Sequence, residues 1–163
     1  MLHWTEITVD GNLKLRLVGS GAGIRTVDFP PARPVDCERD DRDPLLAELA
    51  RELAAYFAGT LRRFEVPLEM QGTAFQKRVW RQLEAIPFGE TRSYRQIAAA
   101  IGAETAVRAV GAANGANPVP IVVPCHRVIG SSGKLVGYGG GLELKKRLLE
   151  LEGSRAMGMR YEE

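Results

Sequence analysis

The period of the apolar residues changes along this 163-residue chain, and that change constrains the fold more than any other feature. Residues 4–29 alternate apolar and polar side chains, with Ile7 and Val9 in one run and three leucines between positions 13 and 17 in the next. A period of two predicts strands with one buried face. The Asp-Gly-Asn sequence at 10–12 predicts a tight turn between the two runs, and therefore a β-hairpin.

The segment that follows predicts a loop and then a helix. Residues 30–44 combine proline with dense charge and show no apolar period, which predicts an exposed loop that contains Cys37. Asp43 then caps a helix that starts with a proline and stops at Gly59. The apolar face of this helix consists of Leu45, Leu46, Leu49, Leu53, Tyr56 and Phe57. Residues 1–70 are therefore predicted to form a small N-terminal α/β domain.

Residues 71–163 carry helical periods and predict a second, mainly helical domain. Thr73, Ser93 and Thr105 are each placed to cap a helix, and the last two helices are short. Two short helices joined by a three-residue turn outline a helix-turn-helix, although corners of this length also occur in folds that do not bind DNA. The third helix is mostly alanine and glycine, with Arg108 as its only charged residue, so it can approach another backbone closely.

The densest apolar stretch, residues 119–124, ends directly before Cys125, His126 and Arg127. Burial raises the pKa of a thiol, so a catalytic Cys125 needs a nearby base or cation, for which His126 and Arg127 are candidates. Consecutive residues of an extended chain point to opposite faces, so a water or a turn at Pro124 is needed to join His126 and the thiol. A buried structural cysteine beside a satisfied histidine stays an alternative on these residues alone.

The C-terminal part predicts a small hairpin around 131–134, a glycine-rich loop at 137–141 and a helix over 142–152. The loop lacks the Gly-Lys-Ser/Thr of a phosphate-binding loop and is better suited to the close approach of a flat ligand. Glu152, in the last turn of the helix, opposes the helix dipole, which indicates a partner such as an imidazole. Glu150 shares this position, so the indication is not specific.

Composition and charge exclude several classes of protein. With 45% apolar and 26% charged residues, the chain is neither collagen-like nor disordered. Residues 1–70 carry nine Lys and Arg against twelve Asp and Glu, whereas residues 71–163 carry thirteen against eight. A basic second half suits a polyanion such as nucleic acid, but so small an excess is also typical of a solvated surface.

The cysteine and histidine counts argue against a metal site and a disulfide framework. Cys37, Cys125, His3 and His126 are the only such residues, so a four-ligand zinc site would use all of them, and we predict no metal. The chain has no run of eighteen apolar residues, and its start lacks the pattern of a signal peptide. We therefore expect a soluble, cytoplasmic protein without a membrane span.

Six short motifs together resemble the O6-alkylguanine-DNA alkyltransferases. They lie at 93–94, 108–111, 117–118, 124–130, 138–141 and 148–153. The resemblance is specific over residues 72–153 because the Pro-Cys-His-Arg sequence has the expected order and spacing relative to the other five motifs. The first half resembles the family's N-terminal domain by length and position only. The implied fold is α/β (α+β), with a small N-terminal α/β domain (1–70) and a C-terminal domain (71–163) that contains a winged-helix-like helix-turn-helix and an active-site cysteine loop.

The resemblance implies direct reversal of DNA alkylation, in which Cys125 accepts the alkyl group of a flipped guanine irreversibly and each molecule acts once. It implies that His126 is the base, acting through a water, and that Glu152 orients it. Asn117 resembles the hinge between the recognition helix and the active site. No cofactor is implied.

The same resemblance assigns the DNA contacts and the substrate pocket. Arg108 resembles the finger that fills the gap left by the flipped nucleotide, on a helix that lies in the minor groove. Tyr94 resembles the tyrosine that crowds the target phosphate and donates to guanine N3. Further implied DNA contacts are Ser93, Arg95, Ala109 and Ser131. The implied pocket consists of Tyr138 as a wall, the carbonyls of Cys125 and Val128 as readers of the guanine amine, and the Gly139 amide facing O6. The implied partner is duplex DNA, bound by a monomer; cooperative binding stays open.

The sequence departs from some relatives at three positions. Gly139 replaces a serine, which removes a hydroxyl contact, and Asn114 and Gly115 replace bulkier residues. Two other functions remain as alternatives. A non-catalytic sensor of alkylated DNA is disfavoured by the presence of Cys125, and a Cys–His hydrolase is disfavoured because no acyl-oxyanion arrangement is evident.

Overall fold

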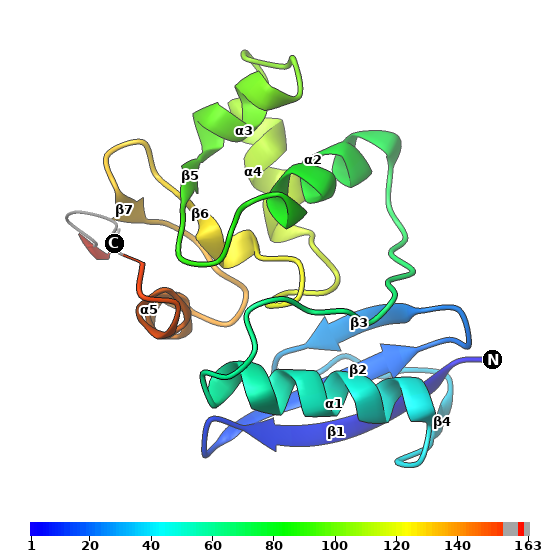
Figure 1. Cartoon of the computed structure of the whole chain (residues 1–163). Coiled ribbons are helices and arrows are strands. Elements are labelled where there is room, and N and C mark those ends of the chain that lie inside the picture. The colour runs from blue at the N-terminus through cyan, green and yellow to red at the C-terminus, as the bar shows by residue number, and fades with distance from the viewer. Residues whose placement is uncertain (155–159, 162–163) are drawn as a thin grey trace. The chain divides into compact units, whose positions relative to one another are not determined.

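The computed structural model describes residues 1–154 and 160–161, whose helices and strands are drawn in Figure 1. The chain divides into two units, Met1–Gln71 and Gly72–Glu163. The first unit is a sheet with one long helix, and the second is mainly helical with short strands. The predicted α/β class, with an N-terminal sheet unit and a helical C-terminal unit, is confirmed.

Four strands form the sheet of the first unit. They are β1 (His3–Val9), β2 (Leu13–Gly19), β3 (Ile24–Asp28) and β4 (Glu38–Arg39). Their order is β3-β2-β1-β4, with antiparallel pairing except between β1 and β4, which run parallel. The hairpin predicted around 10–12 is confirmed, and Asp10 and Gly11 take the positive φ angles of 52° and 84° that tight hairpin turns require. Strand β4 was not predicted, because two charged residues in a loop show no alternation.

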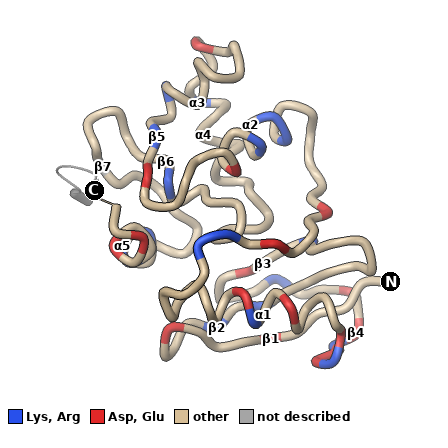
Figure 2. Tube along the Cα trace, in the orientation of Figure 1, with Lys and Arg blue, Asp and Glu red and all other residues tan. Residues whose placement is uncertain are grey.

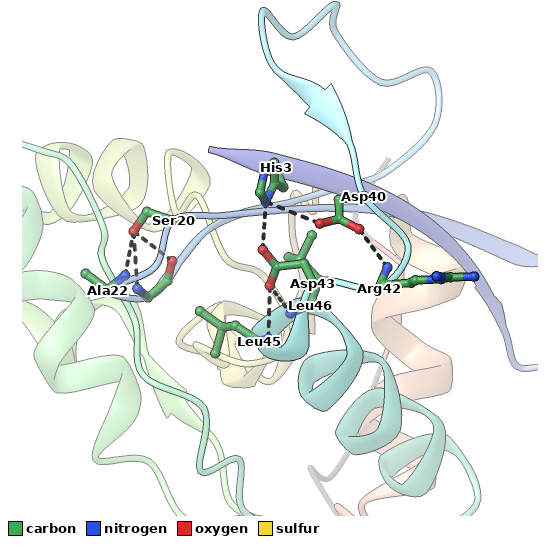
Figure 3. A network of polar contacts seen from close by, with 9 residues as sticks. His3, Ser20, Ala22, Asp40, Arg42, Asp43, Leu45 and Leu46 are labelled. Carbon is green, nitrogen blue, oxygen red and sulfur yellow. Dashed lines mark hydrogen bonds and ion pairs between the residues drawn. The ribbon is translucent and has the colours of Figure 1, made fainter. Parts of the chain in front are cut away.

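Helix α1 (Pro44–Phe57) begins after Asp43, as predicted. One carboxylate oxygen of Asp43 accepts the amides of Leu45 and Leu46 at 2.9 and 3.2 Å. The other oxygen lies 2.9 Å from Nδ1 of His3, the first residue of β1 (Figure 3). A single side chain therefore caps the helix and ties it to the sheet. The buried residues of the helix include Leu46, Leu49, Leu53, Tyr56 and Phe57.

The second unit begins with three helices that pack together. Its elements are α2 (Ala74–Glu84), β5 (Arg92–Ser93), α3 (Tyr94–Ala100), α4 (Val107–Gly115), the 3₁₀ turn η1 (Cys125–Arg127), β6 (Val128–Ile129), β7 (Lys134–Leu135), α5 (Leu142–Leu151) and β8 (Arg160–Tyr161). Thr73 and Ser93 cap α2 and α3 as predicted, each in a capping box with a glutamine three residues on. Trp80 of α2 is buried and donates from Nε1 to the Ala113 carbonyl of α4 at 2.8 Å.

Two predictions for this unit are wrong. Helix α4 begins at Val107 with Ala106 as its cap and no side-chain cap bond, so Thr105 lies in the preceding turn and does not cap it. Residues 131–133 form a turn, but the strands on either side do not pair with each other: β6 pairs with β5, and β7 pairs with β8. A local turn signal cannot reveal that distant segments take up the flanking residues.

The sequence shows no pattern for residues 154–163. In that segment β8 accounts for 160–161, whereas 155–159 and 162–163 lie outside the described residues. None of the helices in the described part of the chain combines the length and the apolar character needed to cross a membrane.

Candidate active site

The apolar stretch before Cys125 folds into a tight turn that Asn117 holds in place. Nδ2 of Asn117 donates to the Val123 carbonyl at 2.8 Å, and Oδ1 accepts the Val119 amide at 3.0 Å. Ile121, within the turn, has a φ of 74°, which is costly for a β-branched residue and persists only because its surroundings hold it. Asn117 therefore fixes the segment that delivers the cysteine.

Cys125 opens the turn η1 and is buried. Burial raises the pKa of its thiol, while a hydrogen bond with Asn117 and the nearby ammonium of Lys145 act in the opposite direction. The thiol is therefore protonated at neutral pH and needs a base to become a nucleophile.

His126 follows directly, and its imidazole is completely buried. Successive side chains of a 3₁₀ turn lie about 120° apart rather than on opposite faces, which removes the geometric difficulty of an extended chain. Nε2 of His126 lies 2.7 Å from a carboxylate oxygen of Glu152. Burial lowers the pKa of His126, so the ring is neutral at pH 7 and donates from Nε2 to that carboxylate. Nδ1 is then an unprotonated base, buried and without a partner among the described residues.

Glu152, at the end of α5, is shared by His126 and Arg127. Nε and Nη2 of Arg127 donate to its two oxygens at 2.8 and 3.0 Å, and Nη1 donates to the Ile86 carbonyl at 2.7 Å. Burial raises the pKa of Glu152, but the hydrogen bonds from His126 and Arg127 outweigh it and hold the pKa at about 2. The structure thus brings His126 and Glu152 together and directs the Arg127 guanidinium to Glu152.

Lys145 of α5 is a site residue that the sequence analysis missed. Its ammonium is fully buried and donates to the carbonyls of Val128 and Val136 at 2.7 and 2.8 Å, with that of Gly137 at 3.4 Å. Burial lowers the pKa of Lys145 to about 8, and the Cys125 thiol opposes this effect. The lysine therefore ties α5 to β6 and to the loop before Tyr138, close to the thiol.

Tyr94 and Arg108 lie on the helix pair α3 and α4. Tyr94 is the first residue of α3, and burial raises the pKa of its phenol. Arg108 is exposed on α4, as are Ala109 beside it and Arg95 on α3. Lys and Arg positions occur along α2 and where β5 leads into α3 (Figure 2). The helix pair thus presents its charged side chains to solvent.

The residues predicted to form the pocket differ in how closely they approach the site. The Tyr138 ring lies edge-on to the His126 ring, with 6.4 Å between the ring centres. Val128 is buried directly after η1. Gly139 and Ser131 lie on exposed parts of the chain, and their contacts stay predictions.

One group of described residues has the spacing of metal ligands, and it lies in the first unit. His3, Asp40 and Asp43 place their ligand atoms within 4.8 Å of one another. The cap of α1 and the bond between His3 and Asp43 already account for two of these side chains, and Asp40 accepts the Arg42 amide at 2.9 Å. Cys37 is not part of the group, and it is a free, half-buried thiol.

Comparisons with known proteins agree with this arrangement. Residues 74–154 match the family described as 6-O-methylguanine DNA methyltransferase, DNA binding domain. Residues 10–70 match the same enzyme's ribonuclease-like domain. A methylated-DNA–protein-cysteine methyltransferase of Methanosarcina acetivorans is 49% identical over 85% of this chain and 90% of its own length. The chain belongs to the 6-O-methylguanine-DNA methyltransferase family.

Further members of the 6-O-methylguanine-DNA methyltransferase family are similar in sequence and in structure. The methylated-DNA–protein-cysteine methyltransferase of Mycobacterium tuberculosis H37Rv is 65% identical over 64% of this chain, and the match spans 64% of that protein's length. The crystal structure of Mycobacterium tuberculosis OGT in complex with DNA has a TM-score of 0.85 and 48% identity, and the match covers 96% of both chains. The methyltransferase of Pyrococcus kodakaraensis KOD1 is more distant, with a TM-score of 0.56 and 26% identity over 94% of this chain and 99% of that chain.

Proposed function

We propose that this chain repairs DNA by direct reversal, taking an alkyl group from O6 of guanine in duplex DNA onto the sulfur of Cys125. The observation that carries the proposal is the buried His126–Glu152 pair, 2.7 Å apart, which leaves an unprotonated Nδ1 on the residue that directly follows the buried Cys125 in η1. The relatives' names and the Mycobacterium tuberculosis OGT structure in complex with DNA support it. Residues 71–163 would carry DNA binding and alkyl transfer, with residues 1–70 as the N-terminal domain.

The transfer balances without a cofactor. Nδ1 of His126 takes the thiol proton, through one water, while Glu152 stabilises the imidazolium that forms. The thiolate sulfur of Cys125 attacks the alkyl carbon, so that the sulfur–carbon bond forms as the carbon–O6 bond breaks. The electron pair of the broken bond goes to guanine, which takes up one proton at N1 while the imidazolium gives up the proton that it received from the thiol. The thioether is stable, so each molecule acts once.

Other residues position the thiol and the extruded guanine. Asn117 holds the turn that delivers the thiol, and Tyr94 donates to guanine N3. Tyr138 forms a wall of the pocket, Val128 contributes its carbonyl, and the Gly139 amide faces O6, where negative charge develops.

Binding to duplex DNA would place the exposed, sparsely substituted helix α4 in the minor groove. Arg108 would fill the stack vacated by the flipped nucleotide, which offsets part of the cost of flipping. Ala109 permits the close approach of the helix. Ser93, Arg95 and Ser131 would contact the backbone. We expect a monomer in the cytoplasm that joins the nucleoid when it binds DNA.

Intact-mass spectrometry after mixing with duplex DNA that contains one O6-methylguanine tests the proposal. We expect one methyl group per chain, mapped to Cys125, and an unchanged mass for Cys125→Ser. An unmodified wild-type mass despite tight binding would identify a damage sensor instead. Release of product in excess of the protein would identify a hydrolase that turns over.

A further inference from the structure

Asn114 is a buried polar residue near Cys125 that the proposed mechanism does not use. It lies in the last turn of α4 and is 6% exposed, although Gly115 directly after it is exposed. The bond from Trp80 to the carbonyl of Ala113 fixes this end of the helix against α2. The amide is therefore held inside the unit rather than turned to solvent.

The two ends of the Asn114 amide have different surroundings. Nδ2 points to the carbonyl of Cys125, at a long distance of 3.5 Å. Oδ1 is buried and has no hydrogen-bond partner in the described part of the chain. Exchanging the two atoms would set oxygen against oxygen, so the donor end belongs at the carbonyl. A buried acceptor without a donor costs free energy, and such atoms are rare enough in folded proteins to require an explanation.

Asn114 also contacts the tyrosine that is proposed to read the base. Gly111 and Asn114 are three residues apart and share one face of α4. A Cβ on Gly111 would lie 3.9 Å from two carbons of the Tyr94 ring, so the ring packs across this face. A hydrogen bond with Asn114 partly offsets the rise that burial causes in the pKa of Tyr94. The amide therefore lies between the Tyr94 phenol and the backbone of Cys125.

The chemistry of the proposed substrate supplies the missing donor. Alkylation at O6 leaves N1 of guanine without a hydrogen, so the exocyclic 2-amino group is the only N–H donor of the base. One acceptor implied for that amine, the Val128 carbonyl, already accepts the Lys145 ammonium at 2.7 Å. In the described part of this region, the buried acceptors that lack a donor include Nδ1 of His126, which serves the thiol, and Oδ1 of Asn114, which is left for the amine.

We propose that Asn114 determines base specificity, its amide oxygen accepting a hydrogen bond from the 2-amino group of the extruded purine. The proposal rests on the proposed function and extends it to a residue of α4. The amide nitrogen meanwhile keeps the Cys125 carbonyl aligned for the same amine.

Single-turnover rates on two duplex substrates test this role. One duplex carries O6-methylguanine and the other carries O6-methylhypoxanthine, which lacks only the 2-amino group. We expect wild-type protein to prefer O6-methylguanine. Asn114→Leu, which keeps nearly the same shape, and Asn114→Ala should reduce the rate on O6-methylguanine on the order of tenfold and leave the other rate almost unchanged. The preference should fall by the same factor.

Val110→Ala is the matched control, because Val110 is buried in the same helix and carries no polar group. It should slow both substrates alike and leave the preference intact. If both Asn114 variants also lost the same factor in rate on the two substrates, the proposal would be overturned, since Asn114 would then have a purely structural role. Melting curves identify a variant that does not fold, and the other Asn114 variant then decides. Absence of methyl transfer by the wild type would contradict the proposed function itself.

Discussion

At the scale of single residues, the protonation of one carboxylate determines what its neighbours can do. Glu152 is ionised and pairs with the charged Arg127, so His126 is not required to carry a charge. The imidazole is therefore available as a neutral base at the pH of the cell. Glu152 lies where its charge opposes the helix dipole, and this position predicted a partner such as an imidazole. The sequence offered no reason to expect that His126 and Arg127 would share Glu152.

Replacing Glu152 by glutamine should destabilise the protein in a pH-dependent way. Folding lowers the pKa of Glu152 from 4.5 to about 2, so its contribution is present above about pH 4.5 and is lost as the pH falls towards 2. A difference of this size corresponds to about 3 kcal/mol at pH 7. We expect urea denaturation to show that loss for Glu152→Gln at pH 7 and less than half of it at pH 3.

Glu150→Gln provides the control, because this carboxylate lies two residues before Glu152, is half exposed and pairs with Lys146 at 3.7 Å. Exposed ion pairs contribute little to stability, so the free energy of unfolding of the Glu150→Gln protein should differ from that of the wild type by less than about 1 kcal/mol. A loss for Glu152→Gln that is as large at pH 3 as at pH 7 would contradict the assigned ionisation.

At the scale of elements, helix starts could be predicted and the pairing of short strands could not. Asp43, Thr73 and Ser93 act within their own turn of chain, so a cap residue before an apolar period is sufficient to identify them. Thr105 carries the same signal but lies one residue before the actual cap, Ala106. The two-residue strands depend on partners distant in sequence, and the predicted hairpin at 131–134 failed for this reason.

Lys145 shows a similar limit for the site. It occupies the apolar stripe of α5 with Leu142 and Leu149, at helical spacing, whereas the adjacent Lys146 faces solvent. A lysine within an apolar stripe was the one feature of the sequence that could have identified Lys145 as a buried residue. Three carbonyls that converge on its ammonium could be found only in the folded chain, because they come from β6 and from the 136–137 loop.

Lys145→Met should loosen the contact of α5 with β6 and raise the pKa of Cys125. The substitution leaves the buried Val128 carbonyl without its ammonium donor, which costs about 1–3 kcal/mol, and removes the positive charge that favours the thiolate. We expect a lower melting temperature and a shift to higher pH in the alkylation of Cys125 by iodoacetamide. Lys146→Met should change neither, and equal effects of both substitutions would refute the role of Lys145.

At the scale of the whole chain, charge is divided unequally between its two parts. The first 70 residues have an acidic excess, and the rest of the chain, which contains α3 and α4, has a basic excess. The basic excess is small, so we expect few phosphate contacts and a moderate dependence of DNA binding on salt. The salt dependence can be divided among individual arginines, because each phosphate contact contributes to it separately.

Arg95→Ala should make DNA binding less dependent on salt by about one phosphate contact. Each contact contributes about −0.9 to the slope of log affinity against log salt, and Arg95 is exposed at the start of α3. Fluorescence anisotropy with a labelled duplex between 50 and 200 mM salt measures the slope. Arg51→Ala, which changes an exposed arginine of α1 that pairs with Glu48, should leave it unchanged. Equal slopes for all three proteins would place Arg95 away from the phosphates and would require other residues to bind the backbone.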